Sequence, residues 1–193
     1  MPNYCNNVVE VSHPDPAKLK ELVEAFNRSE FCSYAIPVPN ELNIVAGRVG
    51  ADDEPEQIKL HEQTMHNLST YGHANWYDFC VSKWGTKWDC GTDDDPKVLE
   101  AGQTNTTLSF VSAWAPPIGV YEALEAQGFE VRAYYDECGM GFCGVWDDGN
   151  DDYYEYGGMS SESVAEMLPP ELDELFCISE TMANYEEADE EAE

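Results

Sequence analysis

Four carboxylates and one glycine lie within the six consecutive positions from Asp147 to Asp152, and such a run could bind a cation. The calcium loop of an EF-hand has Asp or Asn at alternate positions, glycine at the sixth position and glutamate at the twelfth. In this run Gly149 is third, so the spacing does not fit a calcium loop. The residues therefore predict a hairpin turn lined with solvated acids, and no metal site.

Cysteine and histidine are the other residue types that could hold a metal or act as nucleophiles. The seven cysteines, at positions 5, 32, 80, 90, 138, 143 and 177, include no C-x-x-C pair. His61 and His66 are five residues apart, whereas a metal-binding pair on a helix prefers a spacing of four. We expect reduced cysteines that act as small buried apolar residues, with neither a metal nor a cofactor.

No motif of a known catalytic class is present. The sequence has no phosphate-binding glycine loop, no G-x-S-x-G elbow and no zinc-deaminase motif. We therefore assign no catalytic residue. A cysteine and a histidine far apart in sequence can still meet in a fold. A small enzyme acting on a nucleotide or small molecule is the alternative that this leaves open.

The segment Trp84-Gly85-Thr86-Lys87-Trp88 allows two interpretations. It could be a ligand platform, with Lys87 between two indoles. We favour a corner between a helix and a strand, with both tryptophans packed beneath it, because tryptophan supplies a large packing area.

The charge balance decides which partners are plausible. The chain has 39 acidic and 9 basic residues, a formal charge of −30 over 193 residues. A compact chain of this length has a diameter of about 42 Å. The excess charge is then about one per 1.4 Å, near the ~1.7 Å of duplex DNA. Such a surface repels phosphate and suits a basic partner, so we expect no direct nucleic-acid binding.

Composition favours a folded chain, because 42% of the residues are hydrophobic and 12% are aromatic. There is no apolar run long enough for a transmembrane helix, and the first residues do not resemble a signal peptide. We expect no membrane association and residence in a cytosol.

Alternation and helical spacing locate the elements that would position these residues. Strands are predicted at residues 6–12, 86–91, 104–114, 129–135, 142–146 and 152–156. Helices are predicted at residues 17–27, 56–68, 75–83 and 117–127, with a short interrupted one within 161–176. Residues 31–42 are expected to be irregular.

This order predicts an α+β fold with a ferredoxin-like antiparallel sheet of four or five strands and two helices on one face. The domain would span residues 1–157, with a helical insertion at about 30–85. A helical extension at 158–179 and a mobile acidic tail at 180–193 would follow.

Four segments resemble the Api92-like family, which includes YubB-type proteins: Met1-Pro2-Asn3-Tyr4-Cys5-Asn6-Asn7-Val8-Val9-Glu10-Val11, Trp84-Gly85-Thr86-Lys87-Trp88-Asp89, Phe110-Val111-Ser112-Ala113-Trp114-Ala115-Pro116-Pro117, and Tyr135-Asp136-Glu137-Cys138-Gly139-Met140-Gly141-Phe142-Cys143-Gly144. The matches span residues 1–147. The resemblance implies a ferredoxin-like domain and an origin in phages or conjugative plasmids, without a settled activity. The chain departs from the family in its acidity and acidic tail.

Together these features predict a non-enzymatic interaction protein in the host bacterial cytoplasm. Its specific form would be a nucleic-acid mimic that inhibits a defence nuclease or another DNA- or RNA-binding complex through a basic surface. The alternatives are the small enzyme and an acidic accessory protein whose charge serves solubility only. Aromatic residues near the acids, Trp146, Tyr153, Tyr154 and Tyr156, are candidate hot spots. The predicted partner-binding residues are Asp147, Asp148, Asp151, Asp152, Glu155, Tyr153 and Tyr154, with Asp93, Asp94 and Asp95 as a second cluster.

Overall fold

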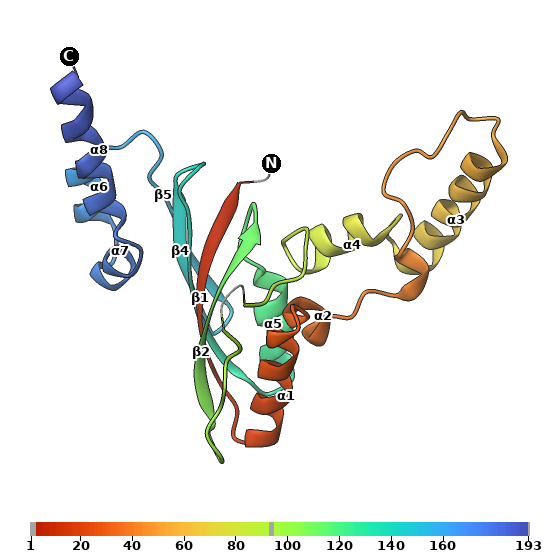
Figure 1. Cartoon of the computed structure of the whole chain (residues 1–193), viewed down its shortest axis with the longest axis horizontal. Coiled ribbons are helices and arrows are strands. Elements are labelled where there is room, and N and C mark those ends of the chain that lie inside the picture. The colour runs from red at the N-terminus through yellow and green to blue at the C-terminus, as the bar shows by residue number, and fades with distance from the viewer. Residues whose placement is uncertain (1–2, 93–94, 193) are drawn as a thin grey trace.

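The computed structural model describes residues 3–92 and 95–192 and contains a five-stranded antiparallel sheet with helices on both faces (Figure 1). The sheet order is β2-β1-β3-β4-β5. The strands are β1 (Tyr4–Ser12), β2 (Asn105–Ala113), β3 (Glu130–Glu137), β4 (Phe142–Asp147) and β5 (Asn150–Glu155). The helices are α1 (Pro16–Asn27), α2 (Phe31–Ala35), the 3-10 turn η1 (Asn40–Leu42), α3 (Pro55–Tyr71), α4 (Trp76–Lys83), α5 (Ile118–Ala126), α6 (Ser161–Met167), α7 (Pro170–Phe176) and α8 (Ile178–Ala192).

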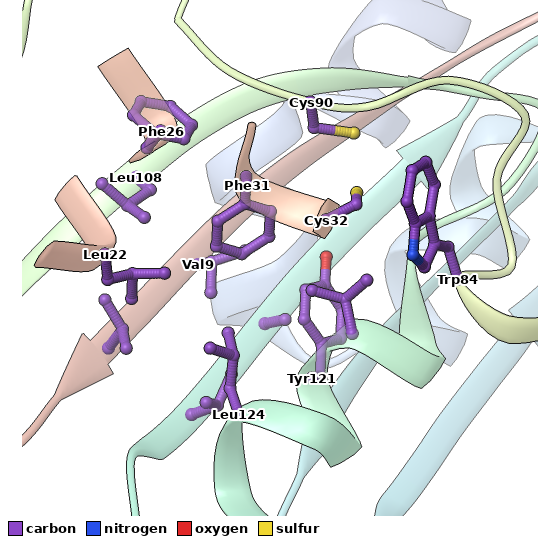
Figure 2. Packing of buried hydrophobic residues seen from close by; sticks show 14 of the residues in the cluster. Val9, Leu22, Phe26, Phe31, Cys32, Trp84, Cys90, Leu108, Tyr121 and Leu124 are labelled. Atoms are coloured by element: carbon purple, nitrogen blue, oxygen red, sulfur yellow. The ribbon is translucent and has the colours of Figure 1, made fainter. Parts of the chain in front are cut away.

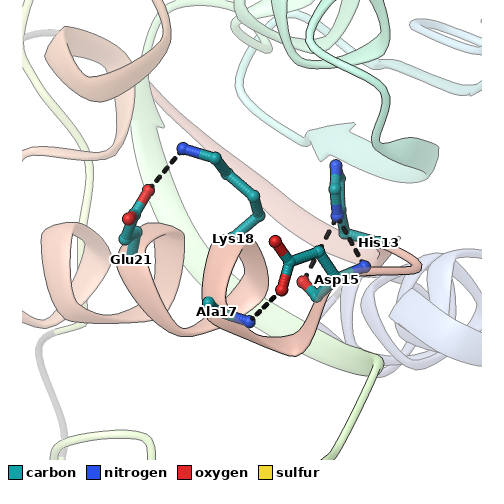
Figure 3. A network of polar contacts seen from close by, with 5 residues as sticks. All are labelled: His13, Asp15, Ala17, Lys18 and Glu21. Carbon is teal, nitrogen blue, oxygen red and sulfur yellow. Dashed lines mark hydrogen bonds and ion pairs between the residues drawn. The ribbon is translucent and has the colours of Figure 1, made fainter.

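Local chemistry explains where α1 begins. The Asp15 carboxylate accepts a hydrogen bond from the Ala17 N–H at 2.9 Å, and Pro16 occupies the first turn, where its missing N–H costs nothing (Figure 3). In the same first turn, the Lys18 ammonium lies 2.8 Å from the carboxylate of Glu21, which stands one turn later. The predicted helix at residues 17–27 is therefore confirmed, with its start one residue earlier.

The main core lies between one face of the sheet and helices α1, α2, α4 and α5. Val9 of β1 and Leu108 of β2 pack with Leu22 of α1 and with Tyr121 and Leu124 of α5 (Figure 2). Helices α1 and α5 thus cover the same face of the sheet, as the sequence predicts.

A second core covers the opposite face over β3 and β4. Tyr134, Cys143 and Val145 point away from the main core and pack against Val164 of α6 and Leu172 of α7. Residues 180–192, which were predicted to belong to a mobile acidic tail, form most of α8. The Glu186 carboxylate accepts hydrogen bonds from the N–H and hydroxyl groups of Ser161, which ties α8 to the start of α6.

The antiparallel sheet is confirmed, but the ferredoxin-like order is not found. That order needs two consecutive strands between its two helices. The prediction of the first of these two strands, at residues 86–91, is wrong. The side chains of this segment bind other parts of the chain instead. The Thr86 hydroxyl bonds both backbone groups of Ala113 at 3.0 Å, and Asp89 accepts hydrogen bonds from the N–H groups of Cys32 and Ser33.

The insertion at residues 30–85 carries α2, η1, α3 and α4. Residues 31–42, expected to be irregular, therefore include a short helix and a 3-10 turn. Helix α3 projects away from the sheet (Figure 1). In the described part of the chain, no helix combines the length and apolarity that crossing a membrane requires.

Candidate functional site

The main predicted acids lie on the β4–β5 hairpin, at one edge of the sheet. Its two-residue turn is formed by Asp148 and Gly149, which both have a left-handed backbone with φ of 47° and 76°. An Asp-Gly pair is favoured in such a turn. The hairpin residues Asp147, Asp148, Asp151, Asp152 and Glu155 are all exposed. We call these five residues the hairpin acids.

Strand alternation divides the hairpin acids between the two faces of the sheet. Asp152 is paired with Val145 of the second core, and Asp151 is paired with Trp146 of the main core. Asp147 therefore lies on the same face as Asp152, while Glu155 shares its face with Asp151. The acids surround the sheet edge instead of forming one flat patch.

Two of the hairpin acids have partners within the protein. The Asp151 carboxylate accepts a hydrogen bond from the Tyr135 hydroxyl at 2.6 Å. Asp147 Oδ2 lies 3.7 Å from Arg132 Nε, and Arg132 Nη2 lies 2.6 Å from Glu171 Oε1. No residue in the described ranges forms a hydrogen bond or ion pair with the side chains of Asp148, Asp152 or Glu155. These three carboxylates are free to meet a partner.

The acidic surface continues from the hairpin into a neighbouring cavity of about 950 Å³. Its lining includes Glu10, Glu125 and Glu130 together with Asp147 and Asp148. Partial burial, followed by the negative charges of Asp148 and Asp147, raises the pKa of the Glu125 carboxyl. The hairpin charges thus act on α5 through space.

Sequence reasoning missed Glu10, Glu125 and Glu130, because each lies on a different element. The outward position of Glu10 on β1 and of Glu130 on β3 was readable from the alternation of these strands. The proximity of Glu10 and Glu130 to the hairpin depends on the pairing of β1 with β3 and of β3 with β4, and these pairings could not be derived locally.

The predicted aromatic hot spots differ in their exposure. Tyr153 is 53% exposed and stacks on Phe142, with 5.4 Å between the ring centroids. Tyr154 is half-buried against the second core. Trp146 and Tyr156 are wrong as partner contacts, because both are buried in the two cores.

Only Asp95 of the second predicted cluster lies within the described residues, and it is not part of the hairpin. Asp93 and Asp94 lie outside the described residues, and Asp95 is exposed in the loop before β2. Two residues later the backbone of Lys97 is hydrogen-bonded to the Asn27 side chain, which keeps this loop beside α1. Strands β2 and β5 form opposite edges of the sheet.

The Trp84–Trp88 segment has features both of a structural corner and of an aromatic platform. Trp84 is buried, and its indole N–H donates to the Ile36 carbonyl at 2.9 Å, as a structural corner requires. Trp88 is 44% exposed instead of packed beneath the corner. The Lys87 ammonium lies 4.5 Å from the Trp88 ring centroid and 5.5 Å from that of Trp114. The platform is therefore covered by its own lysine in a cation–π contact.

Five cysteines are buried, as expected, but Cys138 and Cys177 are exposed, so the expectation of buried cysteines is wrong for these two. Burial raises the pKa of the thiols of Cys80 and Cys143 to about 12, and it raises those of Cys5 and Cys32 as well. A thiol must ionise to attack, so burial makes these four groups inert. Among the described residues, no three His, Cys, Asp or Glu side chains are grouped so that they could hold a metal ion.

Comparison with known proteins yields one structural similarity. No protein-family model and no curated protein matches the chain. A crystal structure of a protein api92 from Yersinia pseudotuberculosis is similar over 82% of this chain and 99% of that one. The sequence identity is 12% and the TM-score is 0.40.

Proposed function

We propose that this chain is a non-enzymatic binding protein whose hairpin acids occupy a basic surface on a nucleic-acid-binding protein or complex. In its specific form it is a phage- or plasmid-encoded nucleic-acid mimic that inhibits a host defence nuclease. The observation that carries the proposal is the set of three unpartnered carboxylates, Asp148, Asp152 and Glu155, exposed on one sheet edge.

The charge of the whole chain supports this assignment. The basic residues Lys18, Lys20, Arg28, Arg48 and Arg132 all form ion pairs with acids close to them. They therefore do little to screen the remaining carboxylates. A net charge of −30 attracts a basic surface over a Debye length of about 8 Å at physiological salt. This attraction accelerates the encounter, and the rigid hairpin then determines where the partner is held.

The same charge argues against nucleic acid as the ligand. Affinity for DNA or RNA comes largely from cations that neutralise phosphates. The hairpin and the adjoining cavity present carboxylates, which repel phosphates, where such a site would need cations. The Arg132 guanidinium beside them is already paired with Asp147 and Glu171. A basic protein surface that normally holds phosphates is the complementary ligand.

A displacement assay tests the proposal. Fluorescent duplex DNA is first bound to a lysine-rich linker histone, which serves as a model basic partner, and the chain is then added. The chain should release the DNA. The triple variant Asp148→Asn, Asp152→Asn, Glu155→Gln should need a higher concentration for the same release, because it removes the unpartnered carboxylates while keeping their shape.

The matched control removes the same number of charges elsewhere. Asp53→Asn, Glu56→Gln and Glu62→Gln replace exposed acids on and before α3, which projects away from the sheet. This control should release DNA nearly as well as the unmodified chain. Equal losses in the two triple variants would mean that only net charge matters, and the hairpin assignment would fall in favour of a solubility role.

A further inference from the structure

We propose that the partner binds along the outer edge of β5 as an added strand, through an extended segment in which lysine or arginine recurs at alternate positions. This inference rests on the proposed function and specifies how the partner would bind the hairpin. It adds backbone recognition to the attraction between charges.

The register of the hairpin identifies the free backbone groups. A two-residue turn makes its flanking residues, Asp147 and Asn150, a hydrogen-bonded pair. Asp152 and Tyr154 therefore also face β4 with their backbone groups. The N–H and C=O groups of the intervening residues, Asp151, Tyr153 and Glu155, point outward.

No described segment covers this edge. Strand β5 is the last in the sheet order, and no loop within the described ranges forms a backbone hydrogen bond with the outward groups. The side chains of the same three residues are also exposed. An extended segment can therefore reach the outward groups without displacing another part of the chain.

The side chains on the edge select a cationic strand. Asp151 and Glu155 lie on one face, with Tyr153 between them, and Asp152 lies on the other face. Tyr153 is held by its stacking on Phe142. Its exposed ring can contact the aliphatic stem of a lysine or arginine, while the flanking carboxylates meet the charged end.

The same side chains argue against a second copy of this chain as the occupant. If two β5 strands paired antiparallel about Tyr153, Asp151 of each copy would face Glu155 of the other. Like charges that face each other across strands are destabilising, and charged edge strands are a common means of preventing self-association. Pairing of two β5 edges is therefore unfavourable, whereas pairing with a segment of opposite charge is favourable.

Replacement of one residue tests the backbone contribution separately from charge. Tyr153→Pro removes an outward N–H, which an edge strand tolerates, and places a ring in the path of an added strand. Tyr153→Thr is the matched control, because it also lacks the aromatic ring but keeps the N–H and a strand-forming residue. Both variants leave the net charge unchanged.

The probe is a short labelled peptide in which lysine alternates with threonine, and binding is measured by fluorescence anisotropy. Tyr153→Pro should bind the peptide about tenfold more weakly than Tyr153→Thr, since a lost hydrogen bond and a steric block act together. Equal affinities for the two variants would overturn the inference.

Amide hydrogen exchange on the unmodified chain gives a second readout that does not depend on the folding of a variant. Peptide binding should slow the exchange of the N–H groups of Asp151, Tyr153 and Glu155. Unchanged exchange at all three would overturn strand addition. If the hairpin triple variant still weakened peptide binding, the proposed function would stand without this inference.

Discussion

Two tyrosine hydroxyls anchor the acidic edge from the interior of the sheet. Tyr135 donates to Asp151 at 2.6 Å, and Tyr156 donates to Asp136 at 2.7 Å. Burial, followed by these hydrogen bonds to carboxylates, raises the pKa of both phenols, so each hydroxyl keeps its proton to donate. The hairpin is thus fixed by hydrogen bonds that leave Asp152 and Glu155 free.

At this scale Asp136 should give the stability of the protein a defined pH dependence. Burial raises the pKa of its carboxyl above the usual value, despite the opposing hydrogen bond from Tyr156. The folded state therefore binds this proton more tightly than the unfolded state does. Its contribution to the free energy of unfolding must fall as pH rises from the ordinary aspartate pKa of about 4 through the raised value.

Asp136→Asn should remove that contribution. As pH rises across this interval, the variant should become more stable relative to the unmodified chain. Its free energy of unfolding should gain about 1.4 kcal/mol on that of the unmodified chain for each unit of pKa shift. Urea denaturation from pH 3.5 to 7 measures it. A difference that is constant with pH would show that Asp136 is not perturbed by burial.

Among the elements, the β4–β5 hairpin depends on a glycine inside β4. A Cβ atom on Gly144 would overlap the Tyr135 hydroxyl and lie 2.7 Å from the Asp152 carbonyl oxygen. Gly144 therefore leaves the space that Tyr135 needs in order to reach Asp151 across the strand.

Gly144→Ala should destabilise the protein by about 1–3 kcal/mol, because the overlap forces the side chain or the strands apart. Thermal and urea unfolding provide the measurement. Gly149→Asn is the control in the same hairpin, since its position is open and asparagine tolerates a φ of 76°. A loss for Gly144→Ala no larger than for the control would contradict this account of the hairpin.

The elements also show how far local sequence patterns reach. Alternation located β1 and β2, and the Asp148-Gly149 pair located the hairpin turn, because both depend on neighbouring residues. The strand predicted at 86–91 failed because side-chain hydrogen bonds by Thr86 and Asp89 to distant segments replaced strand pairing there.

The candidate site was predicted in part for the same reason. The hairpin acids form one continuous segment, so charge and turn residues were sufficient to find them. Tyr156 is buried because α6, α7 and α8 cover the second face, and Trp146 is buried because it points into the main core beside Tyr121 of α5; neither contact follows from local sequence. Glu10 and Glu130 lie near the hairpin through sheet pairing, and Glu125 does so through the packing of α5 against the sheet.

For the whole molecule, the distribution of charge is more informative than its total. Ion pairs with nearby acids occupy Lys18, Lys20, Arg28 and Arg48, while the hairpin edge keeps unpartnered carboxylates. A chain whose acidity served only solubility would not need those carboxylates on a rigid edge. The account therefore predicts binding that depends both on ionic strength and on this one edge.

The most direct test measures binding to the linker histone over a range of salt concentrations, with and without unlabelled duplex DNA. The affinity should fall steadily as salt increases, and DNA should compete with the chain for the histone. The chain alone should not bind the DNA. Binding that is insensitive to salt, or a stable complex of histone, DNA and chain together, would contradict nucleic-acid mimicry.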